Sequence, residues 1–137
     1  MALWEDLSQF INIIDYIESN LMTCRVYVLA QFKPKAGKEA ELFEVLKALE
    51  PDAYREEGCV QYMLTRQIDH PSAVRNEYPI VFNEIWEDAE SWAAHGRRKQ
   101  IQHFFETQVK AESGLVEDAI VTAYTDEGQD YDAPVYL

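Results

Sequence analysis

The sequence has few of the residues that cross-link a chain or bend it sharply: two cysteines, five glycines and five prolines among 137 residues. Two cysteines are too few for a disulfide scaffold or a zinc site, so we expect both thiols to be reduced, as inside a cell. The glycines are scattered and form no Gly-x-Gly-x-x-Gly run, so the usual signature of a dinucleotide cofactor site is absent. With 47% apolar residues and 12% aromatic residues, the composition predicts a folded domain rather than a disordered or fibrous chain.

Basic residues are also scarce: 12 Lys and Arg stand against 25 Asp and Glu, a formal net charge of -13. This balance argues against nucleic acid or an anionic membrane surface as the main partner, because their phosphates would be repelled. The acidic excess lies mostly at the ends, since residues 1–24 and 125–137 each carry four acids and no base. We therefore predict three parts: an N-terminal extension at 1–24, one domain at 25–124 and an acidic tail at 125–137.

The N-terminal part has no basic residue, and Asp15 and Glu18 interrupt its apolar residues, so we expect no signal peptide. No apolar run approaches the roughly 18 residues of a membrane span, and we expect a soluble, cytoplasmic protein. Apolar residues recur in this part at steps of three and four, which predicts an amphipathic helix that packs on its own domain or on a partner subunit. These residues are Leu3, Leu7, Phe10, Ile14, Ile17 and Leu21.

The central part predicts the element order β-α-β-β-α-β. Alternating, β-branched and aromatic residues predict strands at 25–33, 59–68, 80–87 and 115–124. Helical periodicity predicts helices in the two long connections, with the second connection broken at Gly96. This order predicts an α+β fold, a ferredoxin-like sandwich with one antiparallel sheet. The strands are apolar on both faces, so we expect helices to cover one face and a second copy of the sheet to cover the other, in a homodimer.

Residues 25–124 resemble the antibiotic biosynthesis monooxygenase domain family, whose members are dimeric α+β barrels. The resemblance rests on the order and spacing of several marks: Pro34 and Gly37 after the first strand, Glu57-Gly58-Cys59 with Tyr62, Glu84-x-Trp86-Glu87, and His95. The family includes cofactor-independent oxygenases that turn anthrones and quinols into quinones. Other members degrade heme or isomerise small phosphorylated molecules, so the fold alone does not determine the chemistry. The resemblance implies a small aromatic substrate, dioxygen as co-substrate and no cofactor.

Aromatic residues are the candidate walls of a substrate pocket. The quinone-forming members have a tryptophan at the position of Trp86 and an aromatic residue at that of Trp92. The resemblance therefore implies that these two residues and Phe82 enclose a planar ring, with Tyr62 and Phe104 as further substrate-binding candidates. Core packing explains each of these side chains equally well.

His95 is the first candidate base. A histidine at this position is common in the quinol-oxidising branch of the family, and imidazole titrates near neutral pH, which suits proton abstraction. The alternative is a solvated histidine at a helix C-terminus, just before Gly96, where the helix dipole favours it. That branch often has a second histidine at the position that is Gln100 here, and His103, three residues further, is the second catalytic candidate.

Asn83 is a further substrate-binding candidate. Quinone-forming members have an asparagine four residues before the tryptophan, on the same strand face, and that position is Phe82 here. Asn83 precedes Trp86 by three residues, so strand alternation places it on the opposite face, at the dimer interface, unless a bulge turns it into the pocket. No metal site is predicted, because the histidines have no partners at ligand spacing.

The sequence thus predicts a cofactor-independent monooxygenase that oxidises an electron-rich quinol, anthrone or polyketide-type aromatic with molecular oxygen. In this prediction His95 or His103 removes a phenolic or benzylic proton, and dioxygen reacts with the bound anion. Two alternatives stay open. One is an isomerase or cyclase that uses the same pocket without oxygen, and the other is a non-catalytic ligand-binding or structural dimer whose N-terminal helix fills or covers the cavity.

Overall fold

The structure is a computed structural model that describes residues 24–128. The predicted N-terminal helix and most of the acidic tail lie outside the described residues, so both stay predictions. The described chain runs through β1 (Val26–Pro34), α3 (Glu39–Lys47), α4 (Glu50–Tyr54), β2 (Cys59–Arg66), β3 (Ile80–Trp86), α5 (Ala89–Gly96), α6 (Lys99–Phe104), the π-helical turn η1 (Phe105–Lys110) and β4 (Val116–Thr125). The predicted β-α-β-β-α-β order is confirmed.

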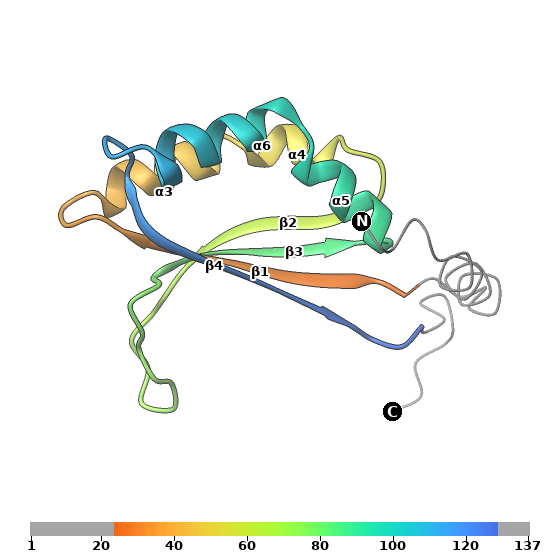
Figure 1. Cartoon of the computed structure of the whole chain (residues 1–137). Coiled ribbons are helices and arrows are strands. Elements are labelled where there is room, and N and C mark those ends of the chain that lie inside the picture. The colour runs from red at the N-terminus through yellow and green to blue at the C-terminus, as the bar shows by residue number, and fades with distance from the viewer. Residues whose placement is uncertain (1–23, 129–137) are drawn as a thin grey trace, which may run out of the picture.

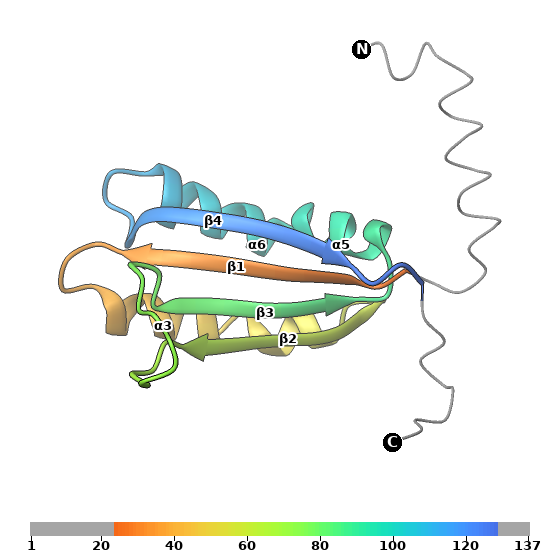
Figure 2. The same ribbon diagram turned by 90° about the horizontal axis from the view of Figure 1, so that it is seen from below.

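The four strands form one antiparallel sheet in the order β2-β3-β1-β4. All the helices of residues 24–128 lie on one side of this sheet (Figure 1), and the view from below shows that none of these helices covers its other side (Figure 2). The register aligns one row of residues across the inner face, the face toward the helices: Ala123, Val28, Glu84 and Tyr62. The fold is therefore the predicted ferredoxin-like α+β sandwich.

The core fills the space between the sheet and the helices. In β1 and β3 every second side chain is buried, as a strand with one covered face requires. On α3, Leu42 and Leu46 are one helical turn apart and fully buried against the sheet. Burial of each such side chain contributes about 2 kcal/mol to folding. The largest fully buried side chains are those of Trp86 and Phe82, next to the site described below.

The outer face of the sheet is also apolar. Leu29, Val81 and Ile85 are half-buried there, while Met63 and Ile120 are exposed. No described helix covers this face, so pairing with a second copy stays a prediction. In the described part of the chain, no helix combines the length and the apolar character that crossing a membrane requires.

Candidate functional site

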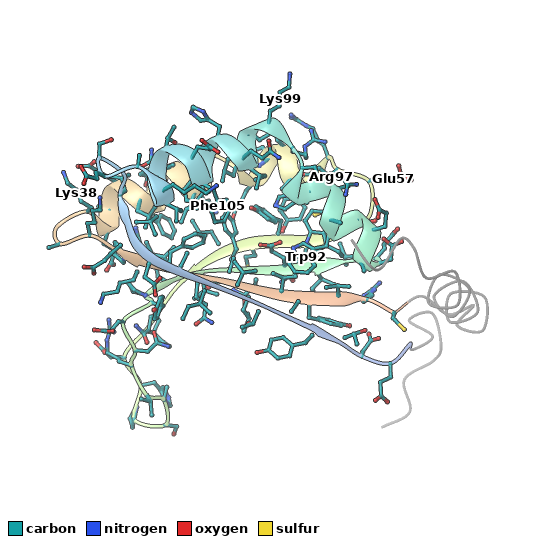
Figure 3. The ribbon with its side chains drawn as sticks, in the orientation of Figure 1. Lys38, Glu57, Trp92, Arg97, Lys99 and Phe105 are labelled. Carbon is teal, nitrogen blue, oxygen red and sulfur yellow. The ribbon has the colours of Figure 1, made fainter. Side chains whose placement is uncertain are left out.

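A cavity of about 340 Å³ lies between the helices and the inner face of the sheet. Trp92 on α5 and Phe105 at the start of η1 lie between the helical layer and the sheet (Figure 3). The lining is mostly apolar and comes from every layer of the fold. It consists of Ala30, Phe32, Leu46, Leu49, Tyr62, Phe82, Glu84, Trp92, Ala93, His95, Gly96, Ile101, Phe104, Phe105 and Val121.

Three titratable side chains line this cavity, and they lie together. Glu84 and His95 are each 5% exposed, and Tyr62 is also buried. The Tyr62 ring stacks on Phe82 with 4.2 Å between ring centroids, and the His95 ring lies 5.0 Å from the Tyr62 ring. The cavity therefore has apolar walls and one polar cluster, as expected of a site for a small, mostly apolar molecule.

The first member of this cluster is a histidine oriented by a carboxylate. Asp88 caps α5 by accepting a hydrogen bond from the backbone N–H of Ser91 at 2.7 Å, and the helix carries His95 in its last turn. The Nδ1 atom of His95 lies 3.1 and 3.0 Å from the two carboxylate oxygens of Glu56, whose side chain is also buried. Because a carboxylate accepts, we assign the proton to Nδ1, which leaves Nε2 with a free lone pair.

The surroundings keep this imidazole neutral. Burial lowers the pKa of His95 below its usual value of 6.5, and the hydrogen bond and charge of Glu56 oppose that effect. Arg98 also approaches Glu56, with Nε 3.6 Å from Oε2, and its charge lowers the pKa of His95 as well. At neutral pH His95 is therefore an oriented, unprotonated base.

The second member is Glu84, which lies on the inner face of β3 between Phe82 and Trp86. Its Oε1 accepts a hydrogen bond from the Trp86 indole N–H at 3.0 Å. Burial raises the pKa of Glu84 to about 7, with a smaller rise from the charge of Glu56, while the Trp86 hydrogen bond lowers it. Near neutral pH a large fraction of this carboxyl is therefore uncharged.

The free polar atoms of the cluster face the cavity. Among residues 24–128, Thr122 Oγ1 is the only fully buried side-chain polar atom without a hydrogen-bond partner. The described residues give no partner to Glu84 Oε2, His95 Nε2 or the Tyr62 hydroxyl, so each of these atoms must be accessible. Since all three side chains are buried and line the cavity, the cavity is the space that they reach.

Five of the residues predicted from the sequence line the cavity: Tyr62, Phe82, Trp92, His95 and Phe104. Trp86 does not line it. Its ring is fully buried, with its centroid 4.8 Å from that of His95, and its indole N–H holds Glu84. Trp86 thus supports the site from behind rather than forming the wall that the resemblance implied.

Two further candidates lie outside the cavity: Asn83, on the face that strand alternation predicted, and His103, the second candidate base. β3 continues past Asn83 without a bulge, so this residue is on the outer face, where its amide donates to the Thr65 hydroxyl at 2.8 Å. His103 is exposed, because α6 turns the neighbouring Ile101 and Phe104 toward the core instead. Neither side chain reaches the polar cluster.

Two residues of the site, Glu84 and Glu56, were not predicted from the sequence. A signal for Glu84 was present, since it is the one charged residue in the apolar row of Ile80, Phe82 and Trp86. Glu56 gave no signal, because it is 39 positions from His95 and belongs to an acidic stretch that is typical of a solvated surface.

No group of three or more His, Cys, Asp or Glu side chains in residues 24–128 could hold a metal ion. Cys59, near the cluster, is half-buried, and burial raises the pKa of its thiol to about 11. It is therefore protonated at neutral pH and a poor nucleophile.

The structure is thus a ferredoxin-like α+β sandwich with a mostly apolar cavity between its layers, the kind of place where small-molecule sites usually occur. The family model of the antibiotic biosynthesis monooxygenases matches residues 25–107, and the chain belongs to this family. No curated protein matched the chain.

Solved structures agree with this fold. A protein from Shewanella oneidensis is 32% identical, with a TM-score of 0.63 over 76% of this chain and 92% of that one. A protein from Pseudomonas aeruginosa is 18% identical, with a TM-score of 0.62 over 77% of this chain and 96% of that one. A protein from Mesorhizobium loti, described as a dabb family protein with a ferredoxin-like fold, is 17% identical, with a TM-score of 0.56 over 74% and 95%.

Proposed function

We propose that the protein is a cofactor-independent monooxygenase that oxidises an electron-rich aromatic molecule, such as an anthrone or quinol, with molecular oxygen. The observation that carries this proposal is the neutral His95, held by Glu56 with its free Nε2 at an apolar cavity. Family membership supports the class of reaction. The substrate ring would lie among the side chains of Phe82, Tyr62 and Trp92.

The chemistry needs a base and a dry, apolar space. His95 Nε2 removes a proton from the ring carbon or hydroxyl, and Glu56 stabilises the imidazolium that forms. The resulting anion gives an electron to dioxygen, the two radicals combine at carbon into a peroxide anion, and the His95 imidazolium returns its proton to form the hydroperoxide. Loss of water then converts a ring CH₂ group into a carbonyl, so that one substrate and one O₂ yield one ketone and one H₂O. The mostly apolar lining offers water few hydrogen-bond partners beside the reacting atoms.

We also propose that the active form is a homodimer that pairs through the outer face of the sheet. The exposed Met63 and Ile120 and the half-buried Ile85 support this pairing, because a solvated sheet face normally carries polar residues.

The test is oxygen uptake with 1,8-dihydroxyanthrone, using protein treated with chelator and free of flavin. We expect stoichiometric O₂ consumption, and we expect His95→Gln to abolish most of it while His103→Gln, the matched exposed histidine, retains it. Absence of uptake by the wild-type protein across a panel of anthrones and quinols would refute the proposal. Turnover of a substrate under anaerobic conditions would instead favour an isomerase or cyclase.

A further inference from the structure

We propose that Glu84 is a second substrate-binding residue, which acts as a neutral carboxylic acid and donates a hydrogen bond to an oxygen atom of an uncharged aromatic ligand. This inference deepens the proposed function and rests on it, since it takes the cavity to be the substrate site. The inference gives two residues separate roles in the same step. His95 accepts the proton, and Glu84 stabilises the negative charge that develops on the substrate oxygen.

The geometry of the carboxyl group determines where its proton lies. Oε1 already accepts from the Trp86 indole N–H at 3.0 Å, and an indole nitrogen can only donate. The acid proton therefore belongs on Oε2, the oxygen that has no partner in the described residues and faces the cavity. Trp86 is fully buried and fixes this orientation.

The groups that face Glu84 favour its neutral form. On its own strand it meets Trp86, and from β2 it meets Tyr62 and, further along, Cys59. His95, from α5, lies against the Tyr62 ring and lines the same cavity, and the charge of Glu56, after α4, raises the pKa of Glu84.

No Lys or Arg of residues 24–128 lines the cavity to offset this burial. Within the described chain, β1, β4, α3, the start of α4 and α6 present only apolar residues to the cavity: Ala30, Phe32, Val121, Leu46, Leu49, Ile101 and Phe104. Arg98, the cation beside His95 and Glu56, pairs with Glu56 instead. An ionised Glu84 would thus have no counter-ion, whereas a neutral one is a ready donor.

The absence of Lys and Arg from the lining of the cavity also determines which class of ligand fits it. A carboxylate, sulfonate or phosphate on the ligand would have to leave water for a cavity with no Lys or Arg in its lining, which is costly. An uncharged ring with a hydroxyl or carbonyl oxygen avoids this cost and accepts the Glu84 hydrogen bond. As the proton leaves for His95, a neutral donor that is already in place stabilises the new oxyanion.

The test measures binding rather than turnover, with 2,3-dimethyl-1,4-naphthoquinone as the probe. This molecule has carbonyl acceptors, no titratable group and no open ring position for a thiol to attack. Quenching of tryptophan fluorescence reports binding, because Trp92 lines the cavity. We expect the Kd of the wild-type protein to rise about tenfold per pH unit above about pH 7, where Glu84 ionises.

Two variants of Glu84 separate the donor from the charge. Glu84→Gln keeps a donor for the ligand and an acceptor for Trp86, so we expect binding that matches the wild-type protein at about pH 6 and does not change with pH. Glu84→Leu removes the donor, and we expect weak binding at every pH. His95→Gln is the control, and it should keep the pH dependence of the wild-type protein.

A wild-type Kd that is constant with pH, or a Glu84→Gln variant that keeps the pH dependence, would overturn the inference. Equally tight binding of the analogue with a sulfonate in place of one methyl group would overturn the ligand class. If binding follows the expected pattern but no aromatic substrate drives oxygen uptake, the proposed function is wrong and the role of Glu84 in binding stands. Oxygen uptake together with a Kd that does not change with pH would overturn the role of Glu84 and leave the proposed function standing.

Discussion

Replacement of Glu84 by glutamine is expected to stabilise the folded protein, but only above the pH at which the buried carboxyl would ionise. In the unfolded chain this carboxyl has its ordinary pKa of 4.5, and burial raises the pKa to about 7 in the folded protein. Below pH 4.5 the group is neutral in both states and contributes nothing. As the pH rises, the unfolded chain releases the proton first, so folding becomes less favourable until the folded protein also ionises near pH 7.

The size of this effect follows from the shift. About 2.5 pKa units at about 1.4 kcal/mol each give a cost of about 3 kcal/mol above pH 7, present in the wild-type protein and absent in Glu84→Gln. Glutamine has nearly the same shape and can still accept from the Trp86 indole, so packing changes little. This cost is a large fraction of the stability of a small domain, about 5–15 kcal/mol.

The assay is urea unfolding followed by tryptophan fluorescence, for both proteins at about pH 4 and about pH 8. We expect similar free energies of unfolding at the acidic pH and a gain of about 3 kcal/mol for the variant at the basic pH. Glu87→Gln is the matched control, since Glu87 is exposed at the end of the same strand and should give no pH-dependent gain. Equal effects of Glu84→Gln at both pH values would refute the reasoning.

Four further predictions test the site and the assembly. His95→Gln should lower kcat in oxygen uptake by about 100- to 10,000-fold, the usual contribution of a general base, and a smaller loss would show that another group removes the proton. Glu56→Gln should also lower kcat, and its pH profile should shift because the carboxylate no longer sets the tautomer of the imidazole; an unchanged profile would contradict this role. His103→Gln should leave kcat within about twofold, since its side chain is exposed, and a large loss would return it to the site. Ile85→Lys, on the outer face, should convert a dimer into monomers in sedimentation experiments, and a monomeric wild-type protein would refute the pairing.

The strands were predictable because their signal is local. Burial alternates residue by residue along β1 and β3, and the observed bounds of all four strands differ from the predicted ones by at most two residues: 25–33 became Val26–Pro34 and 115–124 became Val116–Thr125. A central sheet with one face covered by helices requires this alternation, so the pattern and the fold carry the same information.

The helices were less predictable in detail. Gly96 ends α5 as expected, and the chain then turns through Arg98, whose backbone is extended. After Phe104 the helix continues as the π-helical turn η1, which no periodicity in the sequence indicates. Such a turn depends on how Phe105 and its neighbours pack against the sheet, and π-helical turns occur frequently at functional sites.

The site was predictable only where a residue type fits both the sequence position and the chemistry. His95 satisfied both, and its alternative, a solvated end of a helix, was excluded only by the fold that buries it. Asn83 and His103 had suitable chemistry, but their side chains point away from the cavity. One residue along a strand reverses the face of a side chain, and one or two residues along a helix change which side it occupies.

Glu84 gives the strongest argument that this cavity is used. A leucine or methionine at this position of β3 would pack against Tyr62 and Val28 without an ionisable group, and the fold does not need a carboxyl there. The carboxyl instead costs about 3 kcal/mol above neutral pH. A residue that lowers stability within an otherwise consistent core is expected at functional sites rather than structural ones. Since its free oxygen reaches the same space as His95 Nε2, this cost is best explained by what the cavity binds.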